Sequence, residues 1–226
     1  MTTSLTASTT PAPTAATHRS RWALWGSAAG LGGILTNLVL AQTLSESVRA
    51  SGDPQAVVDA LSQGRYHLTA ITGFATVVCL LFFAAGLHRW SRAQASDSLA
   101  LRVAPLGVLA SASALLVAYG VKGQLAAYLD GGFNEKSFTV EGQYFFFMLD
   151  DLAGYFGWFG VTVTAGCLAW LAFRDRLVAR WVGAFGAVVV VAVAAFLLVF
   201  GFTGFSGVIA PVFVLVGGIG LSRMRG

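Results

Sequence analysis

The chain has 226 residues, of which 56% are hydrophobic and 11% are charged, and its formal net charge is +4. A soluble domain carries about 25% charged residues, so this composition, with a mean hydropathy of +0.74, excludes an ordinary water-soluble protein. It indicates a protein that lies in a lipid bilayer. The basic residues separate apolar segments and form no patch, so the positive charge is explained by membrane orientation and no nucleic-acid partner is expected.

The first 20 residues differ in composition from the rest of the chain. Residues 1–20 are rich in Thr, Ser, Ala and Pro and contain no aromatic residue. Such a segment buries too little apolar surface to order itself. We therefore expect a disordered cytoplasmic tail over 1–20 and one six-span membrane domain over 21–226.

Six apolar segments follow the tail, each close to the ~20 residues that a helix needs to cross a bilayer. A backbone in lipid must satisfy its own hydrogen bonds, and the alternating polarity that is typical of a membrane barrel is absent. The expected fold class is all-α, a polytopic six-helix transmembrane bundle. Its spans are predicted at 22–41, 68–87, 103–121, 154–173, 181–200 and 202–221.

The basic residues predict how this bundle is oriented. Ten of the fourteen Lys and Arg residues fall on one side of the predicted spans, and four fall on the other, namely Arg49, Arg65, Lys122 and Lys136. The richer side is cytoplasmic by the positive-inside rule, so both termini are expected inside. All five tyrosines lie toward the outer side, as expected of interfacial aromatic residues. Arg outnumbers Lys twelve to two, which is typical of a GC-rich bacterium and favours the bacterial cytoplasmic membrane.

The connections carry three further predictions. Asp53 as N-cap, Pro54 at the first helical position and Gly64 as a stop predict a short helix on the outer surface. The few residues around 201–204 predict a tight antiparallel hairpin of the last two spans. Arg19 and Arg21 before an apolar run that ends in "VLA" are also compatible with a signal peptide, so cleavage of the first helix stays open.

Two adjacent carboxylates, Asp150 and Asp151, are the main candidates for a site. They lie about one helical turn above Gly154, near the outer edge of the hydrocarbon. Adjacent helical residues point ~100° apart, and Asp150 shares a face with Gly154 and Gly157. We therefore expect Asp150 to face the bundle and to pair with Lys122 at the outer end of the third span.

Arg65 and His67 end the second span at a similar depth. Together with Lys122, Asp150 and Asp151 they would form an outward-facing polar vestibule, because ionisable groups near the bilayer pair and face the bundle. Three interpretations stay open: a charge pair that joins two helices, ordinary solvated interface residues, and a site that handles a ligand or a proton.

Small and polar residues within the spans favour helix packing. Gly26 and Gly30, and likewise Gly154 and Gly157, are spaced as small residues are where membrane helices touch. Asn37 and Gln42 are expected to make hydrogen bonds between helices.

No catalytic, nucleotide-binding or metal-binding motif is found. His67 and His88 are 21 residues apart, which is ~31 Å of helical rise, so they cannot share a metal. The sequence therefore predicts no catalytic residue, no metal and no cofactor.

Two stretches carry a resemblance to a known family: "YHLTAITGFATVVCLLFFAAGLHRW" and "DDLAGYFGWFGVTVTAGCLAWLAFRDRLVARWVGAFG". The chain resembles the bacterial membrane proteins grouped as domain-of-unknown-function family 4386. The resemblance implies a polytopic helical fold and no defined activity. Members often carry a polar stretch, sometimes with a His, where this chain has Asp150 and Asp151, and this chain has no His there.

Three functions are compatible with these observations. The first is an accessory or structural membrane component, surrounded by membrane lipid, that contacts another membrane protein or a second copy of the chain through its helices and outer loops. The second is a small-solute or proton-coupled transporter module that uses the outer vestibule. The third is a membrane-embedded enzyme acting on lipid, although no nucleophile–base pair is present.

Overall fold

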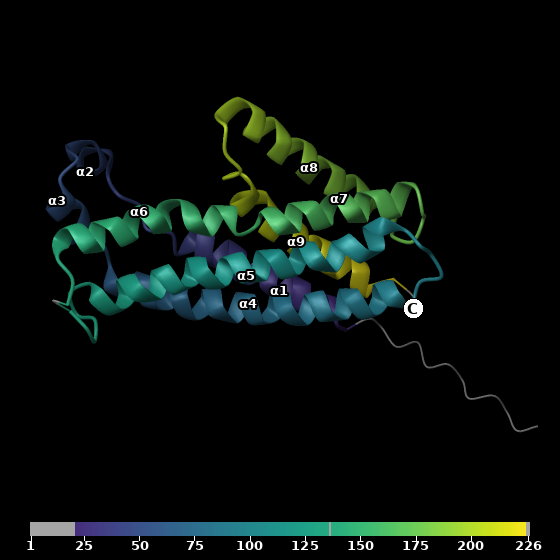
Figure 1. The fold of residues 1–226 in the computed structure, drawn as a ribbon, viewed down its shortest axis with the longest axis horizontal. Coiled ribbons are helices and arrows are strands. Elements are labelled where there is room, and N and C mark those ends of the chain that lie inside the picture. The colour runs from purple at the N-terminus through teal and green to yellow at the C-terminus, as the bar shows by residue number, and fades with distance from the viewer. Residues whose placement is uncertain (1–20, 136, 225–226) are drawn as a thin grey trace, which may run out of the picture.

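The computed structural model describes residues 21–135 and 137–224, so the expectation for residues 1–20 lies outside the described part of the chain. All regular elements in the described part are helices (Figure 1). Four helices are long and apolar enough to cross a membrane: α4 (Gln63–Arg92), α5 (Leu99–Tyr128), the run Val140–Phe173 and α8 (Arg180–Phe200). The all-α class and the membrane-type helices expected from the sequence are therefore confirmed.

The two remaining apolar helices are shorter than a full span. The first covers Ala23–Val39 and consists of α1 (Ala23–Ile34) followed by a π-helical turn, η1 (Leu35–Val39). The second is α9 (Ser206–Ser222). The second is largely buried, whereas the first exposes one face that includes Leu24, Leu31 and Leu38, and the two contact each other closely. Gly30 of α1 is packed against the backbone of Leu215 in α9 and leaves no room for a Cβ atom.

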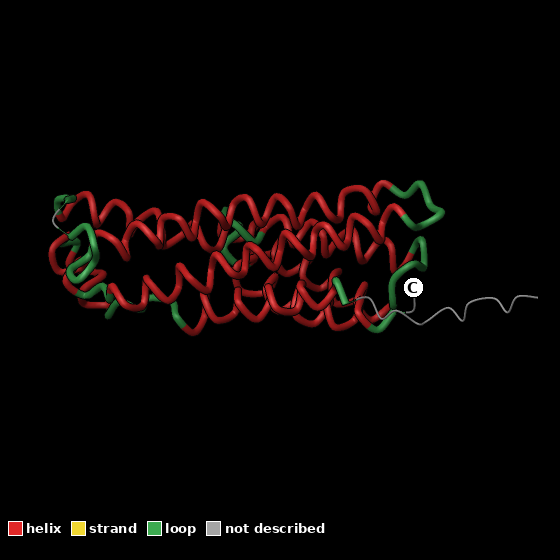
Figure 2. Tube along the Cα trace, turned by 90° about the horizontal axis from the view of Figure 1, so that it is seen from below, coloured by secondary structure: helices red, strands yellow, loops and turns green. Residues whose placement is uncertain are grey.

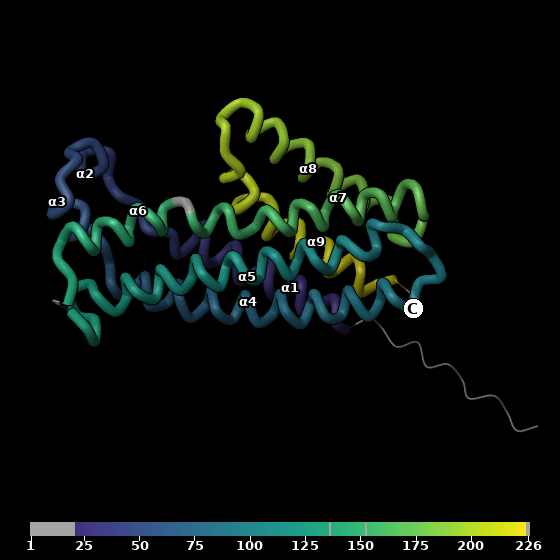
Figure 3. The backbone as a smooth tube through the Cα atoms, viewed as in Figure 1, coloured from purple at the N-terminus to yellow at the C-terminus, as the bar shows by residue number. Residues whose placement is uncertain are grey.

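The run Val140–Phe173 is interrupted, which the sequence did not predict. It consists of α6 (Val140–Phe156) and α7 (Phe159–Phe173), which follow almost one line (Figure 3). The first N–H groups of a helix have no partner within it. At this break the Val161 N–H donates to Ser111 Oγ of α5 at 2.9 Å, so the neighbouring helix stabilises the interruption.

The last two helices do not form the predicted tight hairpin. They touch near the start of α8, where the rings of Phe185 and Phe213 lie 5.6 Å apart, and they separate toward their connection (Figure 1). Each has a different main neighbour. Gly183 of α8 packs on Ala172 of α7, and Gly218 of α9 packs on Ser27 of α1. The short connection therefore joins one end of α8 to one end of α9, but it does not make the two helices pack along their length.

Most loops lie at the two ends of the elongated molecule, and the connection between α8 and α9 lies near its middle (Figure 2). The first described residues and the C-terminal end lie at the same end of the molecule (Figure 1). At the opposite end, α4, α5 and α6 extend beyond the α8–α9 connection and carry a small core of their own. This second core consists of Tyr66, Leu125, Ala126 and Leu129 with Val58, Leu61 and Phe146 packed against it.

Two short helices, α2 (Glu46–Ser51) and α3 (Pro54–Asp59), lie at this end. The predicted start of α3 is confirmed, because Asp53 is its N-cap and accepts a hydrogen bond from the Gln55 N–H at 3.1 Å. The predicted stop at Gly64 is wrong. Gly64 lies in the first turn of α4, since that helix begins at Gln63 and the chain turns before it.

Candidate functional site

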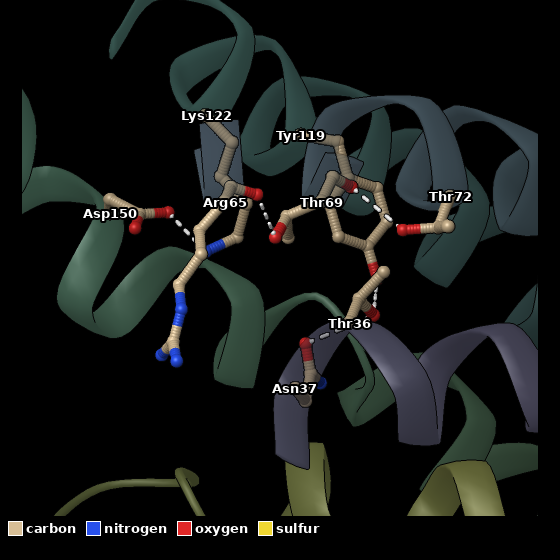
Figure 4. Close-up of polar contacts among 8 residues, drawn as sticks. All are labelled: Thr36, Asn37, Arg65, Thr69, Thr72, Tyr119, Lys122 and Asp150. Atoms are coloured by element: carbon tan, nitrogen blue, oxygen red, sulfur yellow. Dashed lines mark hydrogen bonds and ion pairs between the residues drawn. The ribbon is translucent and has the colours of Figure 1, made fainter. Parts of the chain in front are cut away.

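A buried ion pair joins α5 to α6. The Lys122 Nζ lies 2.7 Å from Oδ1 of Asp150, and the two side chains are only 11% and 6% exposed (Figure 4). Lys122 lies near the C-terminal end of α5, and Asp150 lies in the second half of α6. A charged side chain that is removed from water is costly unless an opposite charge lies close to it. Lys122 and Asp150 serve as such partners for each other.

Polar side chains from η1 and α5 continue from this pair into the bundle. Tyr119 lies one turn before Lys122 on α5, and its hydroxyl is 3.1 Å from Thr36 Oγ1. Asn37 donates from Nδ2 to the carbonyl oxygen of Gly207 in α9 at 3.1 Å. The hydrogen bond between helices expected of Asn37 is therefore present. Thr36 and Tyr119 were not predicted, although Tyr119 shares a helix face with Lys122.

A small cavity of about 40 Å³ lies at the centre of this cluster. Two buried side-chain atoms on its wall, Gln42 Oε1 and Tyr66 Oη, have no hydrogen-bond partner in the described part of the chain, whereas Asp150 Oδ1 has Lys122 Nζ at 2.7 Å. Buried polar atoms are normally hydrogen-bonded to protein or water. A polar space of this size is large enough for a water molecule or two.

Toward the start of α5 the polar cluster ends at large, fully buried side chains. Leu115, one turn before Tyr119 on α5, is fully buried, and so is Trp158 at the break between α6 and α7. Trp158 packs against Gly33 of α1. These side chains close the bundle below the cavity.

Asp151 points to the other side of α6. Its carboxylate lies 3.8 Å from the Arg49 guanidinium of α2, and the two side chains are 48% and 61% exposed. The sequence placed Arg49 in an outer loop but did not predict this contact. Asp151 still reaches the rim of the cavity, so the two carboxylates flank one space in different surroundings.

The start of α4 contributes a different residue from those predicted. His67 is exposed and lies outside the cavity, and Arg65 is exposed, with its Nη1 3.5 Å from the carbonyl oxygen of Ala41. Tyr66, between them, is buried and lines the cavity beside Asp150. Successive helical residues point ~100° apart, so only one of the three faces the bundle. The vestibule therefore contains Tyr66 in place of His67.

The predicted packing glycines have different surroundings. A Cβ at Gly157 would lie 2.5 Å from Leu115 Cδ2, and one at Gly26 would lie 2.8 Å from the Phe83 ring, so both glycines mark close contacts. Gly154 lies on the cavity wall, and a Cβ there would meet Asn37 Oδ1 at 3.5 Å, an ordinary contact distance. Its small size leaves space for the cavity and is not required by helix contact.

Nothing in the described part of the chain groups three His, Cys, Asp or Glu side chains closely enough to hold a metal ion. The side chains around the cavity offer one buried ion pair and several hydroxyl and amide groups.

No family model, curated protein or solved structure matches the chain. The resemblance to family 4386 stays a prediction, and the function must be argued from the site alone.

Proposed function

We propose that the chain is a six-span protein of the bacterial cytoplasmic membrane, with both termini inside, that serves as an accessory or structural component. Four helices that can cross a membrane and two shorter apolar helices support an integral membrane protein. The distribution of basic residues supports the orientation, because ten of fourteen lie on the side of the termini.

The observation that carries the structural role is the closed Lys122–Asp150 pair. It ties α5 to α6 across a distance of 2.7 Å, and the cavity beside it, at about 40 Å³, has no room for a solute larger than water. The six spans predicted from the sequence contain no charged residue. Transport pathways normally place ionisable residues there, so a part in helix contact and assembly fits better.

Purification from the native host in mild detergent tests this function. We expect a stoichiometric partner, either a second membrane protein or a second copy of the chain, when the particle mass and the peptides of the purified material are measured. A homogeneous single-chain particle, retained across several mild detergents, would contradict the accessory role. A tagged membrane protein of similar size from the same host serves as the control for proteins that co-purify nonspecifically.

The proposed orientation has its own test. With Cys79 and Cys167 replaced by Ala, single cysteines are introduced as Ser47→Cys in α2 and Ser96→Cys between α4 and α5. A membrane-impermeant thiol reagent applied to intact cells should label the variant at 47 and spare the variant at 96 until the cells are opened. The reverse pattern would mean that the termini lie outside.

A second candidate function, handling of protons or a very small solute from the outer side, is favoured by one observation. Two buried polar atoms without a partner among the described residues, Gln42 Oε1 and Tyr66 Oη, line one cavity with the paired Asp150 carboxylate near the outer end of the bundle. Proton and solute flux into liposomes distinguishes this candidate. If it is correct, the wild-type protein carries a flux that Asp150→Asn abolishes, and Arg180→Gln, outside the cavity, leaves unchanged.

A further inference from the structure

A groove of about 470 Å³ lies beside the cavity, between the η1–α2 segment, α6 and the α8–α9 connection. Its volume lies within the ~300–1,000 Å³ of small-molecule sites. One end of the groove is polar and the other is aromatic. The polar end is formed by Gln42, Arg49, Asp151 and Tyr155, and the aromatic end by Phe196, Phe202 and Phe205.

The aromatic end of the groove opens where α8 leaves the bundle. Phe196 stacks on Phe205 with ring centroids 5.5 Å apart, so α8 and the start of α9 form a continuous aromatic wall. The last turn of α8 exposes Leu198, Val199 and Phe200 by 86%, 73% and 62%. In a bilayer these side chains meet acyl chains, so a lipid tail can pass from the membrane into the groove without crossing a polar surface.

The polar end carries a cation and an anion together. Arg49 and Asp151 face each other at 3.8 Å, beyond hydrogen-bond distance, and both are about half exposed or more. Each therefore keeps hydrogen-bonding capacity for a ligand. Gln42 adds a buried amide oxygen, Oε1, that accepts no hydrogen bond within the described residues. This end thus offers a guanidinium donor and two oxygen acceptors within one groove.

We propose that this groove binds one membrane phospholipid with a zwitterionic headgroup that carries a primary amine. The Arg49 guanidinium donates to the phosphate oxygens, as is typical of phosphate recognition by arginine. The headgroup ammonium donates to the Asp151 carboxylate and to Gln42 Oε1. One acyl chain lies along Phe196, Phe202 and Phe205. The proposal requires only that α8 lies in the membrane.

The chemistry of the polar end predicts a selectivity among headgroups. A quaternary ammonium has no N–H and cannot donate to Asp151 or Gln42. A headgroup with a phosphate and no cation would bring its negative charge toward the Asp151 carboxylate. A primary-amine headgroup is the one that satisfies Arg49, Asp151 and Gln42 together.

Native mass spectrometry tests the proposal with defined probes. The full chain, purified in a mild detergent and exchanged with an equimolar mixture of phosphatidylethanolamine, phosphatidylcholine and phosphatidylglycerol, should retain one lipid, with phosphatidylethanolamine preferred. Arg49→Gln should lower retention of all three lipids on the order of fivefold, as loss of one charge-assisted hydrogen bond at a half-exposed site implies. Asp151→Asn should remove the preference for the primary amine and keep binding.

The control is Arg180→Gln, an exposed arginine at the inner start of α8, outside the groove. It should bind as the wild type does. Because Arg49 and Asp151 are exposed, their variants should fold, and retained helical circular dichroism checks this. Equal retention in Arg49→Gln and the wild type, or no headgroup preference in the wild type, would overturn the proposal. A second copy of the chain bound in place of lipid would also overturn it.

Discussion

The two sides of α6 at Asp150 and Asp151 place the same side chain in opposite situations. On the bundle side, Asp150 is 6% exposed and lies 2.7 Å from Lys122. On the outer side, Asp151 is 48% exposed and lies 3.8 Å from Arg49. Removing one partner of a buried pair leaves an unpaired charge without water, which is costly. An exposed pair is screened by solvent and contributes little. The comparison teaches that desolvation decides how much each ion pair matters to the free energy of unfolding.

The largest effect is expected from removing one partner of the buried pair. Lys122→Met should lower the free energy of unfolding by about 3–5 kcal/mol, because it leaves the Asp150 carboxylate buried and unpaired. The double variant Lys122→Met with Asp150→Leu should recover most of the loss. Unfolding in mixed micelles with increasing dodecyl sulfate measures both changes. A single variant as stable as the wild type would mean that water reaches Asp150 freely.

Reversal of both charges is a second test of the buried pair between Lys122 and Asp150. Lys122→Asp and Asp150→Lys should each reduce the yield of folded protein, and the combination should restore it. Equal yields for the three variants would rule out the pair as a link between α5 and α6.

A smaller effect is expected from the two glycines on the bundle side of α6. Gly157→Ala should cost roughly 1–3 kcal/mol, since its Cβ would lie 2.5 Å from the side chain of the fully buried Leu115. Gly154→Ala, three residues earlier, meets only an ordinary contact at 3.5 Å and should be neutral within about 1 kcal/mol. The same unfolding assay compares them, and equal losses would show that Gly154 is also a packing contact.

On α4, the buried Tyr66 and the exposed His67 allow the same comparison of a buried with an exposed side chain. Tyr66→Phe should lower the free energy of unfolding by about 1 kcal/mol, because the buried hydroxyl faces the polar cavity beside Asp150, where a water molecule can hydrogen-bond to it. His67→Gln, on the exposed side, should change it by less than about 0.5 kcal/mol. A gain in stability for Tyr66→Phe would show that the hydroxyl is buried without a partner and does not support Asp150.

The smallest effect is expected on the outer side of α6. Arg49→Gln and Asp151→Asn should each change the free energy of unfolding by less than about 1 kcal/mol, since both side chains are well exposed. The effect should shrink further at high salt, because screening acts mainly on exposed charges. A loss as large as that of Lys122→Met would remove the distinction between the two sides.

The pairing of Lys122 with Asp150 could be predicted because both lie at a known depth in their helices. Depth follows from counting residues inward or outward along a span, and unlike charges at equal depth seek each other near a bilayer. Tyr66 was missed because only depth was used for α4, and depth indicated Arg65 and His67. Which of the three neighbouring residues faces the bundle depends on the rotation of α4 about its axis, and that rotation places Tyr66 inside.

The separation of α8 from α9 could not be predicted from their short connection. Loop length limits the distance between two helix ends, and the crossing angle is set by the side chains along the helices. Gly183 lets α8 approach α7, and Gly218 lets α9 approach α1. These contacts direct the two helices to different neighbours, and the aromatic groove opens between them as a result.

By itself the sequence determined that this protein is built of apolar helices suited to a membrane, where most of those helices lie, and that Asp150 faces inward. Apolar length and helical period are local properties, so they can be counted along the chain. Only the tertiary structure decided that the helix around Gly157 is interrupted, that Tyr66 and Thr36 join the charged pair, and that Asp151 meets Arg49. Each of these depends on which helix faces which neighbour, and close packing of small residues from distant parts of the chain sets that choice.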